Sequence, residues 1–198
     1  MSGIPFSGFV LTLLIGINMI YPIDAAGQEN GAIGNAAAVT GKPRQPVRTN
    51  QSFAFVANGR LPDVFPLFGA ERERLWAPGW EPHFLWPSVP NDVAGMVFEV
   101  ARGDRFSTWV NTVFDSATGR VQYVYVISQV VATVITIELR PQGDTTKVVV
   151  RYDRTSLSPE SDAEVKAMAE HDRAAGPEWA AQINAYLARS GVSVSKAR

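Results

Sequence analysis

Hydrophobic and polar residues alternate over much of the chain, and this period of two predicts β-strands. The alternating segments are rich in Val, Ile, Tyr and Phe, which favour strands. Seven strands are expected, at 51–58, 84–87, 95–102, 106–115, 120–128, 130–140 and 145–155. The segments 116–119 and 142–144 contain glycine and are typical of hairpin turns, so the strands on either side of each should pair antiparallel.

Helical patterns occupy the remaining parts of this region. Two short helices are expected over 61–68 and 70–76, because Pro62 suits a first helical turn and Gly69 ends one. Apolar residues then recur every three or four positions from 165 to 187, which predicts one long C-terminal helix, kinked at Pro177. The expected fold is α+β, with that helix lying across a curved seven-stranded antiparallel sheet and a cavity between the two.

The N-terminus has a different pattern. Residues 4–23 form an uncharged apolar run, and Ala25 and Gly27 suit a signal peptidase site. Residues 1–26 are therefore interpreted as a signal peptide or, as the alternative, a membrane anchor, with a cleaved signal favoured. Residues 27–50 are poor in large apolar side chains and are expected to form a flexible spacer. The folded domain is expected at 51–190, followed by a tail at 191–198.

Composition excludes several classes of chemistry. The 198 residues include 18 Lys or Arg, 19 Asp or Glu, two His and no Cys. Disulfides, thiolate metal sites and multi-histidine sites are excluded, so neither a metal nor a cofactor is expected. The near-neutral charge argues against nucleic acid as a partner. The 46% hydrophobic content is enough to form a core.

Several short strings resemble one protein superfamily. They are FPLF at 65–68, LWAPGWEP at 75–82, DSATGR at 115–120 followed by YVYV at 123–126, and WAAQINAYL at 179–187. Together with the element order, they resemble the SRPBCC superfamily of START and Bet v 1-like proteins, which includes polyketide cyclase/dehydrase and lipid transport proteins. The resemblance covers about 51–190 and implies a helix-grip fold. It carries over no catalytic residue, because members of the superfamily share no catalytic signature.

The ligand-binding candidates are apolar, aromatic or acidic residues expected near the cavity. They are Trp76, Trp80, Tyr123, Tyr125, Tyr152, Met168, Asp172, Trp179 and Ile183. The tryptophans at 76 and 80 either rim a pocket or, as the favoured alternative, fill the corner between the short helices and the sheet. Asp172 either points into the cavity or, as the favoured alternative, lies on a solvated edge. His83 is expected to pack, and Glu73 to lie on the solvent side of its short helix.

These features lead to three functional hypotheses. The first is binding or carriage of a small hydrophobic ligand, lipid or polyketide-like, outside the cytoplasm. The second is a cyclase or dehydratase acting in the same cavity, with Tyr152 and Asp172 as the polar groups. The third is an envelope protein that binds another protein through its outer sheet face. No catalytic constellation is visible, and catalytic residues are not assigned.

Export is the expectation that follows from residues 4–23. Cell fractionation with an antibody to the folded domain should find the protein in the periplasm, the medium or the membrane. Recovery of the full-length chain as a soluble cytoplasmic protein would contradict this expectation.

Overall fold

The structure, a computed structural model, describes residues 44–191. The apolar run at 4–23, the spacer before residue 44 and the tail after 191 lie outside the described residues. Seven antiparallel strands form one open sheet in the order β1-β7-β6-β5-β4-β3-β2, which confirms the predicted strands. The strands are β1 (Arg48–Ala57), β2 (Pro82–Trp86), β3 (Val97–Arg102), β4 (Arg105–Asp115), β5 (Arg120–Ile127), β6 (Val131–Gln142) and β7 (Thr145–Ser156).

The turn between β4 and β5 explains why glycine occupies position 119. Gly119 has a φ of +67°, a conformation that residues with a Cβ rarely adopt. A Cβ at this position would also lie 2.3 Å from the carbonyl oxygen of Leu139 on β6. The hairpin can therefore lie directly against the next strand only with glycine at this position.

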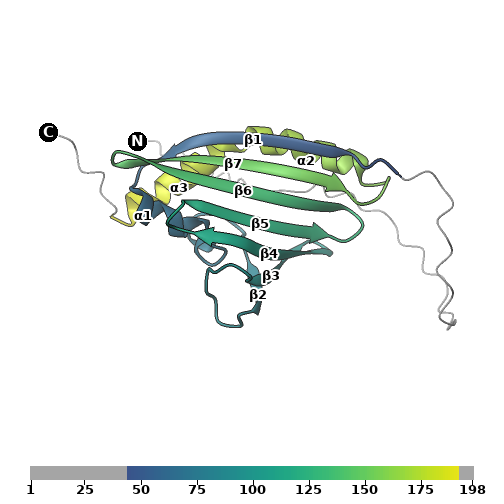
Figure 1. The fold of residues 1–198 in the computed structure, drawn as a ribbon, viewed down its shortest axis with the longest axis horizontal. Helices are drawn as coiled ribbons and strands as arrows, with labels where there is room; N and C mark the ends of the chain where they lie inside the picture. The colour runs from purple at the N-terminus through teal and green to yellow at the C-terminus, as the bar shows by residue number, and fades with distance from the viewer. Residues whose placement is uncertain (1–43, 192–198) are drawn as a thin grey trace, which may run out of the picture.

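The helices pack on one face of the sheet. Figure 1 shows the sheet from its outer side, with α2 (Asp162–Ala174) and α3 (Gly176–Arg189) behind β1 and β7. In the sequence between β1 and β2, the chain forms α1 (Leu61–Val64) and two 3-10 helices, η1 (Phe65–Phe68) and η2 (Arg72–Leu75). The single long C-terminal helix predicted from periodicity is in fact two helices.

The break between α2 and α3 has a local cause. Pro177 lies in the first turn of α3, where its missing N–H leaves no bond unmade. Gly176 packs on Phe53 of β1, and a Cβ there would lie 3.3 Å from the Phe53 side chain. The chain therefore divides at a glycine that packs against the first strand, and α3 begins there.

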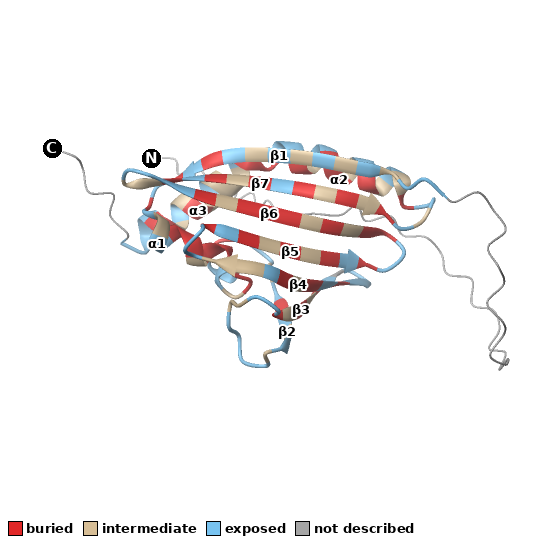
Figure 2. Cartoon of the chain, viewed as in Figure 1, coloured by how far each residue is buried: buried red, intermediate tan, exposed pale blue. Residues whose placement is uncertain are grey.

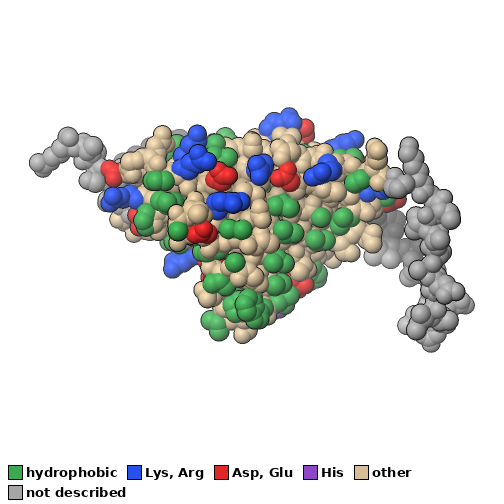
Figure 3. All heavy atoms as spheres, viewed as in Figure 1, with side chains coloured by type: hydrophobic (Ala, Val, Ile, Leu, Met, Phe, Trp, Pro, Cys, Tyr) green, Lys and Arg blue, Asp and Glu red, His purple; other side chains and the backbone are tan. Residues whose placement is uncertain are grey.

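The two faces of the sheet differ in burial. Along β5 and β7, buried residues alternate with intermediate or exposed ones (Figure 2). On the outer face, charged side chains gather over β1, β7 and β6, and hydrophobic ones gather over β5 to β2 (Figure 3). Register places Val97, Val110, Val124 and Val134 side by side on this outer face.

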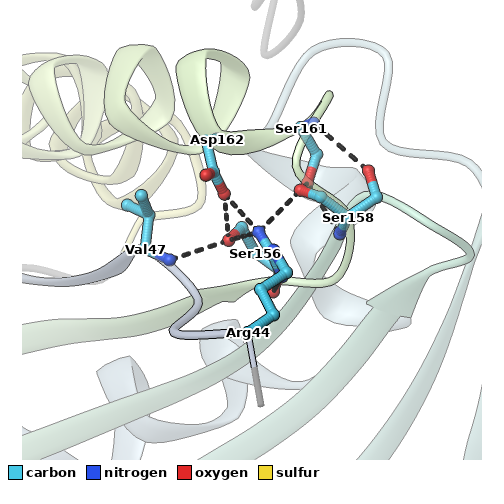
Figure 4. Close-up of polar contacts among 6 residues, drawn as sticks. All are labelled: Arg44, Val47, Ser156, Ser158, Ser161 and Asp162. Atoms are coloured by element: carbon cyan, nitrogen blue, oxygen red, sulfur yellow. Dashed lines mark hydrogen bonds and ion pairs between the residues drawn. The ribbon is translucent and has the colours of Figure 1, made fainter. Parts of the chain in front are cut away.

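The folded domain begins earlier than the sequence predicts. β1 starts at Arg48 rather than Gln51. The Arg44 guanidinium donates to the carbonyl oxygens of Ser156 and Ser158 at 3.1 and 2.7 Å and pairs with Asp162 (Figure 4). The Val47 N–H donates to Ser156 Oγ at 2.9 Å. Residues 44–50 therefore belong to the domain, and the spacer boundary predicted at residue 50 is wrong.

These contacts predict the effect of truncation. A chain that begins at Gln51 should melt at a lower temperature than one that begins at Arg44, because it loses the start of β1 and the Arg44 contacts. Arg44→Ala in the longer chain should produce part of the decrease. Thermal unfolding followed by circular dichroism measures both effects. Equal melting temperatures for the two chains would show that residues 44–50 add no stability.

Candidate functional site

A cavity of about 60 Å³ lies between the concave face of the sheet and the helices. Its wall combines side chains from β4 to β7 with the segment around η2 and one residue of α3. The lining residues are Glu73, Trp76, Ala77, Trp80, Trp109, Tyr123, Tyr125, Ile135, Ile137, Tyr152, Arg154 and Trp179. Most of the wall is therefore aromatic or aliphatic, and two of its residues are charged types.

The structure divides the predicted site residues into three groups. On the cavity wall lie Trp76, Trp80, Tyr123, Tyr125, Tyr152 and Trp179. Met168 and Ile183 are buried in the core but do not line the cavity. Asp172 lies behind the wall, where it pairs with a lining residue. Periodicity locates the buried face of a helix, but it does not show which buried residues adjoin an internal space.

The tryptophans pack and line the cavity at the same time. The indole N–H groups of Trp76 and Trp80 donate to the carbonyl oxygens of Leu67 and Ala70, both at 2.7 Å. The Trp76 ring meets that of Trp179 edge-on, with centroids 5.2 Å apart. Trp80 and Trp179 are the two lining residues that are only partly buried, so the cavity approaches solvent beside them. The two alternatives considered for Trp76 and Trp80 are thus compatible.

A buried ion pair forms one end of the wall. Arg154 donates from Nε and Nη2 to the two carboxylate oxygens of Asp172, at 2.6 and 2.7 Å. Its Nη1 donates to Thr133 Oγ1 at 3.0 Å and to the Tyr125 hydroxyl. Arg154 and Asp172 are only 2% and 3% exposed. The favoured expectation that Asp172 lies on a solvated edge is therefore wrong.

Sequence reasoning missed Arg154, although a signal for it was present. Val148, Val150 and Tyr152 alternate along β7 on the buried face, and the same alternation continues to position 154. The guanidinium also lies over the Tyr152 ring, 4.8 Å from its centroid. A basic residue at a buried strand position indicates a buried acidic partner, because an unpaired charge in the core is strongly unfavourable.

Glu73 is the second residue that sequence reasoning misplaced. It was expected on the solvent side of its helix, but it is buried and lines the cavity. Because η2 is a 3-10 helix with three residues per turn, Glu73 lies on the same side as Trp76. Its carboxyl group has no hydrogen-bond or ion-pair partner among the side chains that the structure describes, which within residues 44–191 exclude that of Arg102. Burial raises its pKa well above the usual value, and the nearby Asp92 carboxylate raises it further.

The polar side chains near Glu73 differ from it because they have hydrogen-bond partners. Asp92 Oδ1 accepts a hydrogen bond from the Glu71 N–H at 3.3 Å, and the Tyr123 hydroxyl donates to the Phe68 carbonyl oxygen at 2.9 Å. Burial raises the pKa of the Tyr123 and Tyr152 phenols, so both are neutral hydroxyls near neutral pH. Within the described part of the chain, no three His, Asp or Glu side chains cluster as metal ligands would.

His83 and Trp86 lie outside this site. Both are exposed on β2, and Trp86 keeps 58% of its surface accessible. The expectation that His83 packs within an aromatic corner is therefore wrong. β2 is an edge strand, so the backbone groups along one of its edges have no partner strand.

Solved structures share this architecture. Norcoclaurine synthase from Thalictrum flavum, in complex with dopamine and hydroxybenzaldehyde, aligns over 81% of this chain and 99% of its own, with a TM-score of 0.54 and 15% identity. Ara h 8.0201 aligns over 72% and 99%, with a TM-score of 0.53 and 12% identity. The Mll3558 protein from Rhizobium loti aligns over 73% and 100%, with a TM-score of 0.51 and 17% identity.

The chain has the Bet v 1/SRPBCC-like fold. This confirms the fold that the sequence strings and the element order predict. No protein-family model matches the chain, and no curated protein matches it in sequence. At these identities the likeness shows the helix-grip Bet v 1-like fold alone, and the chemistry of the cavity follows from its own residues.

The buried Glu73 predicts a particular dependence of stability on pH. The pKa of Glu73 is higher in the folded than in the unfolded chain. Its contribution to the free energy of unfolding is therefore fully present at pH values below the ordinary carboxyl pKa, and it is lost as the pH rises through the pKa of the folded state. Glu73→Gln removes this ionisation. The variant should therefore lose less stability than the parent between about pH 4 and pH 9.

Denaturant unfolding across this pH range measures the effect. Glu81→Gln is the control, because Glu81 is close in sequence but its side chain is 80% exposed. Asp92 interacts with Glu73, so the difference between the parent and Glu73→Gln reports on the two carboxyl groups together. Identical pH profiles for the parent and Glu73→Gln would contradict the prediction.

Proposed function

We propose that the chain binds a small, largely apolar ligand in the cavity beneath the sheet. The observation that carries this proposal is a cavity walled by four indoles and three phenols that still presents the unpartnered carboxyl group of Glu73. Apolar walls with a few placed polar groups are typical of small-molecule sites. A core that served stability alone would have little use for an unpaired acid at that position.

The size of the cavity narrows the class of ligand. Its volume of about 60 Å³ is below the ~150 Å³ of an apolar void that admits benzene. A bilayer lipid or a long polyketide does not fit a cavity of this volume. A ligand of one or two rings would fit after an outward movement of Trp179, a partly buried residue of the wall.

The fold supports a role in holding small molecules. Norcoclaurine synthase, which shares this architecture, has been solved in complex with dopamine and hydroxybenzaldehyde. Those compounds have one ring each, which is within the size of ligand proposed above. We take from this comparison the size of the ligand, and we take neither the place where it binds nor the reaction.

Export belongs to the proposal as well. The uncharged run at 4–23 supports a location outside the cytoplasm, with the domain from residue 44 carried through the membrane or held at its surface. Within residues 44–191, no helix is long and apolar enough to cross a membrane.

Acid–base catalysis of the cyclase or dehydratase type is the second candidate function. The position of Glu73 favours it, because a carboxyl group with a raised pKa can exchange a proton with a ligand at near-neutral pH. Asp172, which sequence reasoning considered for this role, is less suited, since both its oxygens accept from Arg154. Turnover that depends on Glu73 would distinguish an enzyme from a carrier.

A pair of identical substitutions tests the cavity. Ala77 lines it, whereas Ala57 is fully buried in the core. Ala77→Leu should fill the space with little loss of stability, and Ala57→Leu should cost about 1–3 kcal/mol through overpacking. The parent should bind the neutral probe benzyl alcohol saturably, as followed by tryptophan fluorescence, and Ala77→Leu should weaken that binding.

Exposed Trp86 provides a constant background in this assay, while the other four tryptophans line the cavity. Absence of saturable binding to the parent, together with equal destabilisation by both substitutions, would show a solidly packed interior. The row of outer valines on β3 to β6 would then support the protein-interaction role instead.

A further inference from the structure

The charges buried around the cavity do not balance. Arg154 and Asp172 form a bidentate pair and neutralise each other. Glu73 has no such partner, and the charged group that acts on its carboxyl group is another carboxylate, Asp92, which disfavours the ionised form. No Lys, Arg or His among the described residues pairs with Glu73. An ionised Glu73 therefore requires a cation from outside the protein.

The surroundings of Glu73 suit an organic cation. The indoles of Trp76, Trp80, Trp109 and Trp179 share the cavity wall with its carboxyl group. Aromatic faces attract ammonium groups, and the attraction grows when the site is shielded from water. The Trp76 and Trp80 N–H groups are already bonded to backbone carbonyls, which fixes the position of both rings.

We propose that the ligand of this cavity carries a cationic amine that binds the Glu73 carboxylate between the indole rings. The proposal rests on the function proposed above, that the cavity holds a small ligand, and it adds the chemical class of that ligand. The ligand must then have an apolar part that packs on the indole rings and a positive charge that pairs with Glu73. An aromatic or short aliphatic amine has both.

Other occupants match the wall less well. A neutral hydroxyl can bond to the neutral Glu73 carboxyl group, but it does not form the stronger charge-assisted hydrogen bond that an ammonium group forms with the carboxylate. A divalent metal ion needs several oxygen ligands, and among residues 44–191 no group of three acidic or histidine side chains supplies them. Asp92 is not a wall residue, and its Oδ1 already accepts from the backbone of Glu71.

Two probes of matched size test the proposal. Benzylamine and benzyl alcohol share a ring and a one-carbon arm, and they differ in charge at neutral pH. Isothermal titration of the domain should show benzylamine binding at least about tenfold more tightly, as a charge-assisted hydrogen bond predicts. Glu73→Gln should reduce the ratio of the two affinities to about one. Glu73→Asp, which keeps the charge on a shorter arm, should retain part of the preference.

Glu81→Gln is the matched control, because it removes one negative charge from the surface and should leave the ratio unchanged. Equal affinities for the two probes in the parent would overturn the amine proposal while the cavity function stands. A preference that survives in Glu73→Gln would overturn it in the same way. Failure of the parent to bind either probe would overturn both proposals together.

Discussion

The bidentate pair between Arg154 and Asp172 joins β7 to α2, and the placing of the helices over the sheet depends on it. Both side chains are almost fully buried, so removal of either partner would leave an uncompensated charge and cost about 3–5 kcal/mol. The same guanidinium bonds to Tyr125 on β5 and Thr133 on β6. One side chain therefore connects three strands to the helix just before it ends, and α3 then brings Trp179 over the cavity.

Much of the fold is predictable from the sequence because each strand buries one face. On β7 the buried Val148, Val150 and Tyr152 alternate with exposed or partly exposed residues, among them Lys147 and Arg151, so its inward face could be identified without coordinates. The break at Gly176 was harder to locate. Pro177 indicates a kink, but the end of α2 depends also on Phe53, which lies far away in the sequence.

The candidate site was less predictable because its polar residues depend on partners from other elements. Asp172 lies in line with the buried Val165 and Met168 on α2, but helical periodicity contains no information about Arg154, the partner on a strand that makes its burial possible. Glu73 was misplaced because its charge indicated a solvent-exposed position, and nothing in the local sequence shows that this side of η2 faces the cavity. Arg44 lies in a stretch whose composition resembles a linker, yet its single side chain binds Ser156, Ser158 and Asp162.

The pairing of β1 with β7 also has a consequence for how the chain folds. Asn50 and Asp153 are neighbours in the sheet but lie 103 residues apart in sequence. Because such contacts form only after a large loop closes, they slow folding. During synthesis β1, with its Phe53 and Phe55 side chains, emerges first and has no partner strand until nearly the whole domain has been made. For most of that time it is an uncovered apolar strand, the kind of segment that chaperones bind and that promotes aggregation.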